Sequence, residues 1–488
     1  MLLKAGILSL ALLVTSRVLG LARESAQAAA FGSSGMGDLA VLMLTLPDLV
    51  AGLFASGALA YVLLPYWARQ AERYHPASQR KVAGWLLAGG LLAGLALWLA
   101  HEHVVALLAS GLPAELYPVA HNAVAFSAAS VPMALLAALW GTRLQHERDF
   151  AGMYGASVVV NLVLVATLVS LVYGVAADIP VRYLGVALLA SMLARLAWLG
   201  WRQRPKEQVP VDCAGLQEPM PGAAIWIWAA LSAGVPLAVP LVARSIASTG
   251  GEGNLASFNY AWKLVELPLV FAIQLVTTLA FPEMARAFAQ KEDVGPAVRR
   301  TFMLVWALAC ACAAGLLVGA RPLAQLLFGW GRMTPDSVLR LADWAASGAW
   351  SLLPQALTAV SLTILAIRDR LRLAVLAYIL ALFALLLAGS WTAGDGTRLM
   401  LSLNLVFTGV AAASLLALGR GSSNWLPWRP MAVPGAAVVL LWGMHAGGVG
   451  VPASTGVLAG LAVAGATALA VLASAWLASG SIRRQLPR

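Results

Sequence analysis

The sequence predicts an all-α integral membrane protein with about fourteen transmembrane helices, and three observations support this prediction. Of the 488 residues, 61% are hydrophobic and only 11% are charged, whereas a soluble chain has about 25% charged residues. The mean hydropathy is +0.82, and apolar runs of spanning length recur along the whole chain. The basic residues gather in every second connection between these runs, as the positive-inside rule requires.

Each predicted span is an apolar run long enough to cross the bilayer, and several exceed the minimum, so we expect tilts or kinks. The fourteen spans lie near residues 7–30, 37–67, 82–100, 119–142, 151–174, 182–201, 223–247, 255–285, 300–320, 338–366, 372–391, 397–418, 431–448 and 454–478. The first run resembles a signal peptide that ends at Ala26–Ala28. We reject that interpretation because Arg17, Arg23 and Glu24 interrupt the run before the supposed cleavage site.

The basic residues also predict the orientation, with the N- and C-termini in the cytoplasm. With this orientation most of the 32 basic residues fall in cytoplasmic connections. The net charge of +11 therefore reflects membrane topology, and we expect no nucleic-acid partner. The cytoplasmic groups include Arg69, Arg73, Arg80 and Lys81; Arg143 and Arg148; Arg202, Arg204 and Lys206; Arg286, Lys291, Arg299 and Arg300; Arg368, Arg370 and Arg372; and Arg483, Arg484 and Arg488.

The second and eighth spans resemble one another. Leu46–Pro47 is followed by Leu64–Arg69 in one, and Leu267–Pro268 is followed by Phe281–Arg286 in the other. A small-polar segment precedes each copy, at Gly32–Gly35 and Thr249–Gly251. Six spans separate the copies, so both run in the same direction, and parallel repeats predict two lobes around an axis normal to the membrane.

The repeat divides the chain into four parts. We predict an N-terminal six-helix lobe at 1–202, a proline-rich cytoplasmic linker at 203–222 and a C-terminal six-helix lobe at 223–420. Two extra transmembrane helices and a basic tail follow at 431–488. Two lobes that face a central cavity are the usual build of a rocking transporter.

Ionisable residues inside spans are costly in lipid, so they must face one another or a wet cavity. Arg17 lies about 16 Å into the first span, too deep to reach the cytoplasmic interface comfortably. Glu24 follows on nearly the same face, whereas Arg23 points elsewhere. Two interpretations remain open for these cations: ion pairs that orient helices, or the lining of a cavity for an anionic ligand.

Other spans carry further charges. Lys263 and Glu266 are three residues apart on one helix face and can pair directly. Asp38 and Asp48 lie in the second span. Arg195 lies near a cytoplasmic end and is predicted to be an interface anchor. Two interpretations remain open for Arg244: a cation at the mouth of a cavity, or a residue near the outer edge that extends its side chain to the interface.

No motif indicates an enzyme, and we expect no catalytic residue, no cofactor and no metal site. The chain lacks a phosphate-binding loop, a zinc-ligand helix motif and a nucleophile elbow. His101 and His103 are expected in an outer loop as a solvated pair. Cys310 and Cys312 are two residues apart on an expected helix, where small apolar fillers are the ordinary interpretation.

Two regions of the sequence contain short stretches that together form a recognisable pattern. These stretches are Ser16–Glu24, Phe31–Gly32, Asp38, Leu46–Leu49, Phe54–Ala58 and Tyr260–Pro268. The pattern resembles the MurJ/MviN family of lipid II flippases, within the MOP superfamily of exporters. The match is specific over residues 9–70 and 258–290 and only architectural elsewhere.

This resemblance implies a flippase of the bacterial inner membrane that moves a lipid-linked saccharide from the inner to the outer leaflet by alternating access. Its substrate-binding residues would be Arg17, Arg23 and Lys263, since a guanidinium can engage two phosphate oxygens at once. Glu24, Asp38 and Glu266 would support them in ion pairs. Its partners would be the lipid-linked substrate and membrane lipid, and a coupling ion or the membrane potential remains open.

The chain departs from the family pattern at several positions that are usually charged. Thr45 replaces a lysine, Ala51 and Gly52 replace paired arginines, Ser56 replaces a glutamate, and Lys263 replaces an arginine. These departures leave two candidate substrates. Lipid II for peptidoglycan synthesis is the leading one, and another lipid-linked oligosaccharide, such as an exopolysaccharide repeat unit, is the alternative. An ion-coupled drug exporter is disfavoured because Arg17 and Arg23 would repel its cationic ligands. A membrane assembly factor that transports nothing is a fourth alternative.

Overall fold

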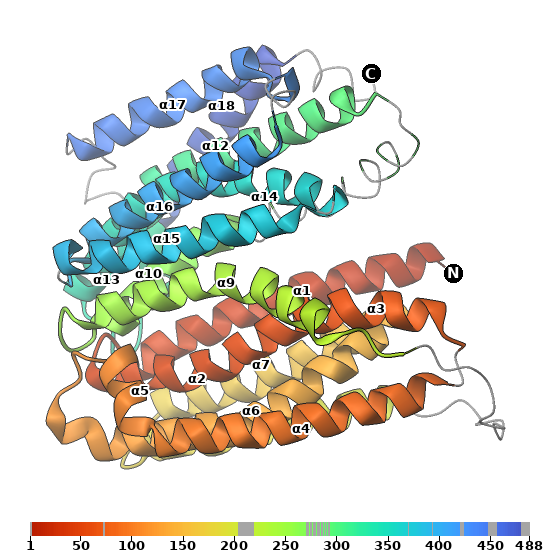
Figure 1. Cartoon of the computed structure of the whole chain (residues 1–488). Coiled ribbons are helices and arrows are strands. Elements are labelled where there is room, and N and C mark those ends of the chain that lie inside the picture. The colour runs from red at the N-terminus through yellow and green to blue at the C-terminus, as the bar shows by residue number, and fades with distance from the viewer. Residues whose placement is uncertain are drawn as a thin grey trace. The chain divides into compact units, whose positions relative to one another are not determined.

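The structure is a computed structural model, and every regular element that it describes is a helix (Figure 1). It describes residues 2–71, 74–203, 219–269, 293–368, 370–392, 394–419, 424–447 and 456–479, with isolated positions between 270 and 292. The chain divides into two compact units. The first comprises Met1–Leu241 with Gly251–Ala256, and the second comprises Val242–Gly250 with Ser257–Arg488.

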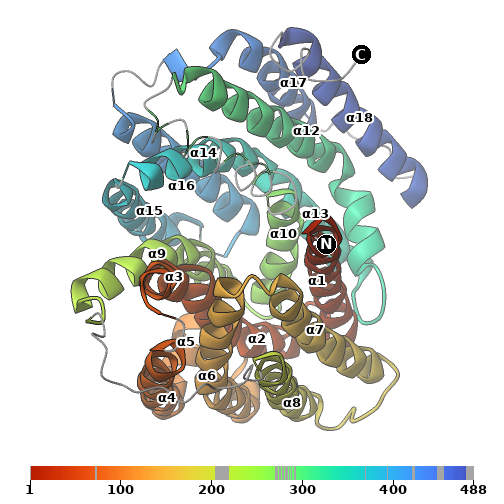
Figure 2. The same ribbon diagram turned by 90° about the vertical axis from the view of Figure 1, so that its right-hand side faces the viewer.

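The first unit is built from long helices joined by short connections. Its elements are α1 (Leu2–Phe31), α2 (Gly35–Leu53), the π-helical segment η1 (Phe54–Ala58), α3 (Leu59–Arg69), α4 (His75–Leu99), α5 (His101–Leu108), the 3-10 turn η3 (Ala114–Leu116), α6 (Tyr117–His146), α7 (Phe150–Val172), α8 (Pro180–Arg202) and most of α9 (Ala223–Ser248). The helices α6, α7 and α8 pack side by side and are seen nearly end on in Figure 2.

Helix α4 shows how the first unit separates its packing face from its outer face. Gly90 and Gly94 are buried against α6, and a Cβ at Gly94 would lie 2.6 Å from the carbonyl oxygen of Ala128. The opposite side of α4 exposes large side chains such as Leu92 and Leu99. Small residues allow two helices to approach closely where lipid competes for apolar side chains, so this arrangement is typical of a membrane helix.

The second predicted span is not a uniform helix. Pro47 lies inside α2, Pro65 lies inside α3, and the π-helical segment Phe54–Ala58 separates them. Gly57 within this segment lies so close to α9 that a Cβ would collide with Ala233. The regular α-helical hydrogen bonding of this span is therefore interrupted between its two prolines, at a kind of segment where helices commonly bend.

One ion pair fastens the ends of α6, α7 and α8. Asp149 caps α7 by accepting a hydrogen bond from the backbone N–H of Gly152 at 2.9 Å. Arg202, at the end of α8, donates to both carboxylate oxygens of Asp149, at 2.9 and 2.7 Å. Partial burial opposes ionisation of Asp149, but these hydrogen bonds outweigh it and hold the pKa of the carboxyl below its usual value.

The second unit contains the remaining helices. Its elements are the end of α9, most of α10 (Asn254–Pro268), α12 (Gly295–Phe328), α13 (Pro335–Gly348), the 3-10 turn η5 (Ala349–Ser351), α14 (Leu352–Ile367), α15 (Leu371–Thr392), α16 (Gly396–Ala417), α17 (Trp428–Ala446) and α18 (Val457–Ala478). Helix α12 is the centre of this unit, because α13, α14, α17 and α18 all pack against it.

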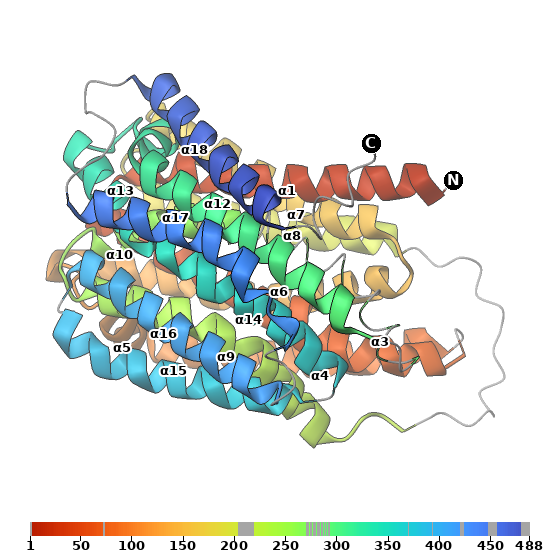
Figure 3. The ribbon, with the colours of Figure 1, turned by 90° about the horizontal axis from the view of Figure 1, so that it is seen from above.

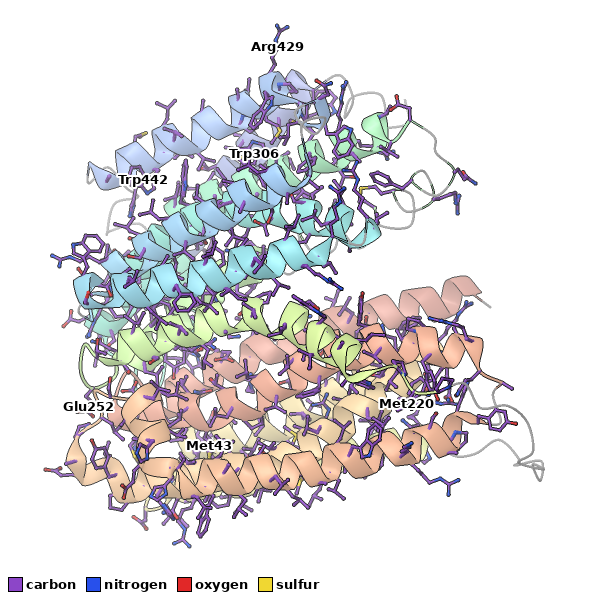
Figure 4. The ribbon with its side chains drawn as sticks, viewed as in Figure 1. Met43, Met220, Glu252, Trp306, Arg429 and Trp442 are labelled. Carbon is purple, nitrogen blue, oxygen red and sulfur yellow. The ribbon has the colours of Figure 1, made fainter. Side chains whose placement is uncertain are left out.

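The two last helices attach to α12 through small residues and one hydrogen bond. Gly319 on α12 faces Ala464 on α18, where a Cβ would lie 2.6 Å from that of Ala464. Trp306 on α12 donates its indole N–H to the carbonyl oxygen of Met431 on α17 at 2.9 Å (Figure 4). Figure 3 shows α17 and α18 beside α12.

Helices occupy each of the predicted spans within the described residues, and ten of these helices are long and apolar enough to cross a membrane. The total of fourteen spans stays a prediction. So do the four predicted parts, because residues 204–218 of the proposed linker and the second half of the eighth-span repeat at 281–283 lie outside the described residues.

The expectation that His101 and His103 lie in a loop was wrong. They begin the short helix α5, which continues with the apolar residues Val104, Val105 and Leu107. His101 packs its ring 4.1 Å from that of His121 on α6.

The Asp149–Arg202 pair predicts a pH-dependent stability. Replacing Asp149 with Asn keeps the cap and removes the charge, so we expect a loss of about 0.5–1 kcal/mol at pH 7 for this partly exposed pair. A lowered folded-state pKa gives stability that is present above the unfolded value of about 3.9 and is lost as the pH falls through the folded value. In thermal unfolding of the purified protein, the difference between wild type and Asp149→Asn should therefore shrink below about pH 4. A difference independent of pH would contradict this account.

Candidate functional site

A group of charged side chains connects α1 and α2 inside the first unit. The Nη2 of Arg23 donates to Glu24 Oε1 on its own helix and to Asp48 Oδ2 on α2, both at 3.0 Å. The Arg23 side chain is 11% exposed and that of Glu24 is 8% exposed, whereas that of Asp48 is 48% exposed. The expectation that Arg23 points away from Glu24 was wrong, because the long guanidinium side chain folds back to its sequence neighbour.

A third helix also contributes to this group. The charge of Asp48 acts on the guanidinium of Arg195, which lies on α8. The role of Arg195 as an anchor at the membrane interface stays a prediction.

Several buried donors in this region have no acceptor in the described part of the chain. They are Nε of Arg23, Nε of Arg195 and the side-chain amide nitrogen of Gln27. Gln27 follows Arg23 by one helical turn on α1. Buried donors are normally paired, so these N–H groups can donate further hydrogen bonds to anionic oxygens or water.

Arg17 lies apart from this group, on an exposed part of α1. Val14, one helical turn earlier, and the adjacent Val18 are also exposed. Among the described residues Arg17 makes no ion pair with an acid. The helix continues unbroken past Gly20, where Asn161 of α7 approaches and donates to the carbonyl oxygen of Ser16 at 3.3 Å.

Asp38 is buried and binds backbone rather than a basic side chain. Its two carboxylate oxygens accept hydrogen bonds from the backbone N–H groups of Gly253 and Ala256, each at 2.8 Å, at the start of α10. Glu252 in turn accepts from the N–H of Gly35 at the start of α2, at 2.8 Å (Figure 4). Asp38 on α2 therefore caps the N-terminus of α10, and Glu252, just before α10, caps the N-terminus of α2; both carboxylates are favourably placed at the positive ends of the helix dipoles.

These caps occupy equivalent places in the predicted repeat. Gly35 precedes Pro47 by the same number of residues as Ala256 precedes Pro268, and the same holds for Gly32 and Gly253. Both Gly32 and Gly253 have positive φ, at 68° and 77°, a conformation that favours glycine. The residues equivalent to Gly32 and Gly35 are therefore Gly253 and Ala256. They lie slightly later in the chain than Thr249–Gly251, the segment that the sequence pattern paired with Gly32–Gly35.

Lys263 belongs to the second unit, on α10. Its Nζ donates to Glu266 Oε2 at 2.9 Å, so the pair expected from their spacing is present. The side chains are 27% and 37% exposed. The preceding Trp262 is buried and stacks on Phe407 of α16, which fixes this part of α10 against its own unit.

The predicted site residues thus fall into separate arrangements. Arg23 and Glu24 join with Asp48 and Arg195, Lys263 joins with Glu266, Asp38 acts as a helix cap, and Arg17 stays apart. Guanidinium and ammonium groups with remaining donor capacity can bind anions such as phosphate. Within the described residues no group of three or more metal-ligating side chains is found.

Comparison with known proteins identifies relatives over most of the chain. A family model described as lipid II flippase MurJ matches residues 27–424. The chain is 29% identical over 349 residues to a probable lipid II flippase MurJ of Rhizobium meliloti, which covers 66% of this chain and 63% of that protein. It is 26% identical over 347 residues to the lipid II flippase MurJ of Burkholderia cenocepacia, covering 67% and 66%. The matched part therefore spans less than two thirds of either relative.

Solved structures show the same fold. A lipid II flippase MurJ in an inward closed conformation superposes with a TM-score of 0.79 at 12% sequence identity, covering 96% of this chain and 99% of that one. An inward-facing MATE family multidrug resistance transporter of the MOP superfamily gives a TM-score of 0.60 at 15% identity, covering 89% and 98%.

The capping role of Asp38 predicts a loss of stability when its charge is removed. Asp38→Asn keeps one acceptor oxygen but leaves one of the two backbone N–H groups facing an amide NH₂ group. A buried donor left unpaired costs about 1–3 kcal/mol, so the thermal unfolding temperature should fall. Glu252→Gln is the matched control, because its amide oxygen can still accept from Gly35 and the loss should be smaller. An unchanged unfolding temperature in Asp38→Asn would refute the capping role.

Proposed function

The chain belongs to the lipid II flippase MurJ family, and we propose that it moves a polyprenyl-diphosphate-linked saccharide across the bacterial inner membrane by alternating access. The proposed substrate is lipid II for peptidoglycan synthesis, carried from the inner to the outer leaflet. In the proposed topology both termini lie in the cytoplasm, as the distribution of basic residues favours.

The observation that carries the proposal is the placing of cations inside helices of an apolar chain. Arg17, Arg23 and Lys263 all lie within apolar helices. A cation within a bilayer is retained at a cost of about 2.5–3.5 kcal/mol on insertion scales, so it usually serves a function. A diphosphate offers several anionic oxygens, which guanidinium groups bind in a two-pronged manner. We propose that each of the three cations contacts the diphosphate during transport, with Glu24 and Glu266 as supporting acids.

One observation favours the alternative substrate. Helix α2 contains two acids and no basic residue, so the second span adds no positive charge of its own. A flippase for a different lipid-linked oligosaccharide, such as an exopolysaccharide repeat unit, is consistent with this reduced charge.

Growth rescue distinguishes the two substrates. The gene is expressed in a bacterium from which the native lipid II flippase is depleted, with an Arg23→Ala variant as the negative control. Sustained growth with the wild-type gene supports lipid II as the substrate. Failure to grow despite normal membrane levels, together with restored polymer export in a strain that lacks an exopolysaccharide flippase, would favour the alternative.

The first-helix arginines should be indispensable for transport. Arg23→Ala removes a buried cation and leaves Glu24 and Asp48 facing each other's charge. Losing one partner of a buried pair costs about 3–5 kcal/mol, or several hundredfold or more in affinity. Arg17→Ala should abolish transport, and Arg17→Lys should impair it, because a point charge does not reproduce the two-pronged contact.

The control is Arg340→Ala, which removes an exposed cation from α13 and should leave transport unchanged. Membrane levels are measured for every variant. Near-normal transport by well-expressed Arg17→Ala and Arg23→Ala proteins would remove the main physical support for a diphosphate substrate.

A further inference from the structure

One arginine of the second unit is held in place beside the connection between α16 and α17. The guanidinium carbon of Arg368, the residue after α14, lies 4.6 Å from the ring centroid of Trp425 and 5.2 Å from that of Phe288. Its Nη1 donates to the carbonyl oxygen of Leu418 at 3.0 Å. Two aromatic rings and a backbone carbonyl therefore fix the position of the Arg368 side chain.

A second arginine reaches the same connection from α12. Arg299, in the first two turns of α12, donates its Nε–H to the carbonyl oxygen of Asn424 at 2.5 Å. Asn424 directly precedes Trp425, so the guanidinium groups of Arg299 and Arg368 contact adjacent residues. Arg370 follows Arg368 by two residues and has an exposed side chain. We call Arg299, Arg368 and Arg370 the arginine cluster.

The arginine cluster has donors to spare for an external anion. No acid among the described residues forms an ion pair with any of its three members. A guanidinium has five N–H groups, and the bonds to backbone carbonyls use one from Arg299 and one from Arg368. The positive-inside rule requires only that charge lie on the cytoplasmic side. It does not require guanidinium groups that are fixed in position, whereas a binding site does.

The arginine cluster lies at the level where lipid headgroups are expected. It follows the end of α14, and its contacts lie between the end of α16 and the start of α17, which is the cytoplasmic surface in the proposed topology. Trp428, the first residue of α17, is 57% exposed, and exposed tryptophan at the end of a spanning helix is typical of the headgroup region. The anion at this level is the phosphate of a phospholipid, and the cytoplasmic leaflet contains anionic lipids.

We propose that the arginine cluster binds the phosphate of an anionic phospholipid of the inner leaflet. Arg299 and Arg368 donate to the phosphate oxygens, for which the planar guanidinium is well suited, and Arg370 adds positive charge. A zwitterionic lipid carries a cation close to its phosphate, which the cluster repels. The bound lipid links α12 to the α14–α15 connection and so stabilises the second unit. This inference depends on the proposed topology and not on the proposed substrate.

Lipid-dependent stability tests the inference. The full chain is purified in dodecyl maltoside, and thermal unfolding is followed while dioleoylphosphatidylglycerol or dioleoylphosphatidylcholine is added. Affinity is taken from the lipid concentration that gives half of the full stabilisation, and native mass spectrometry counts the bound lipids. The variants are Arg299→Gln, Arg368→Lys and Arg370→Gln. Arg340→Gln is the matched control, because Arg340 is an exposed arginine on α13, beyond the other end of α12.

Wild type should bind phosphatidylglycerol at least about tenfold more tightly than phosphatidylcholine, because several cations near a membrane surface act together. Arg299→Gln and Arg370→Gln should each weaken phosphatidylglycerol binding about fivefold and leave phosphatidylcholine binding unchanged. Arg368→Lys should also weaken it, because an ammonium keeps the charge but loses the forked arrangement of donors. Arg340→Gln should respond to both lipids as wild type does.

Three results would overturn the proposal. The first is equal affinity of wild type for the two lipids. The second is an unchanged lipid preference in Arg299→Gln and Arg370→Gln, or an equal loss of preference in Arg340→Gln. The third is displacement of phosphatidylglycerol by soluble glycerol phosphate at comparable concentrations, which would show that the site takes free phosphates. Arg370 is exposed, so Arg370→Gln decides the question if a substitution at Arg299 or Arg368 prevents folding.

Discussion

Hydrocarbon solvates charge poorly, and this constraint governs how the described helices of the first unit associate. An arginine within an apolar helix must find a carboxylate, a backbone oxygen or water, or its helix would not remain in the bilayer. Arg23 meets this demand by reaching Glu24 on its own helix and Asp48 on α2. The same carboxylate acts on Arg195 of α8, so one acid balances charges from two sides. The association of α1 with α2 therefore includes an ion pair as well as apolar contact.

Helix pairs that have no ion pair between them associate through close approach of their backbones. Apolar side chains gain little by leaving lipid for one another, so helices associate through tight packing of small residues. Gly94 of α4 lies against the carbonyl of Ala128, and Gly319 of α12 lies against Ala464. Large leucines such as Leu92 face outward. The chain therefore reverses the arrangement of a soluble protein, with small residues between helices and bulky apolar residues at the periphery.

Much of this could be predicted from the sequence because it depends on local properties. Helix positions follow from apolar runs, and the Lys263–Glu266 pair follows from a three-residue spacing. The relation of Arg195 to Asp48 could not be predicted, because it depends on the approach of α8 to α2 across more than a hundred residues of chain. Asp38 was expected to pair with a basic side chain, yet its partners are backbone N–H groups that leave no mark in residue identity. Helix α5 was missed because a histidine-rich stretch outside the apolar runs looks like a loop.

The reciprocal caps at the starts of α2 and α10 also constrain the order of biogenesis. Asp38 and its partner Gly253 are separated by 215 residues, so during N-to-C synthesis α2 exists long before the N–H groups it will cap. Until α10 emerges, Asp38 and the first amides of α2 need water, which holds this end of the helix at the membrane surface. Closing so long a loop is a late event. The corner formed by the starts of α2 and α10 therefore remains incomplete at least until residue 256 has been synthesised and inserted.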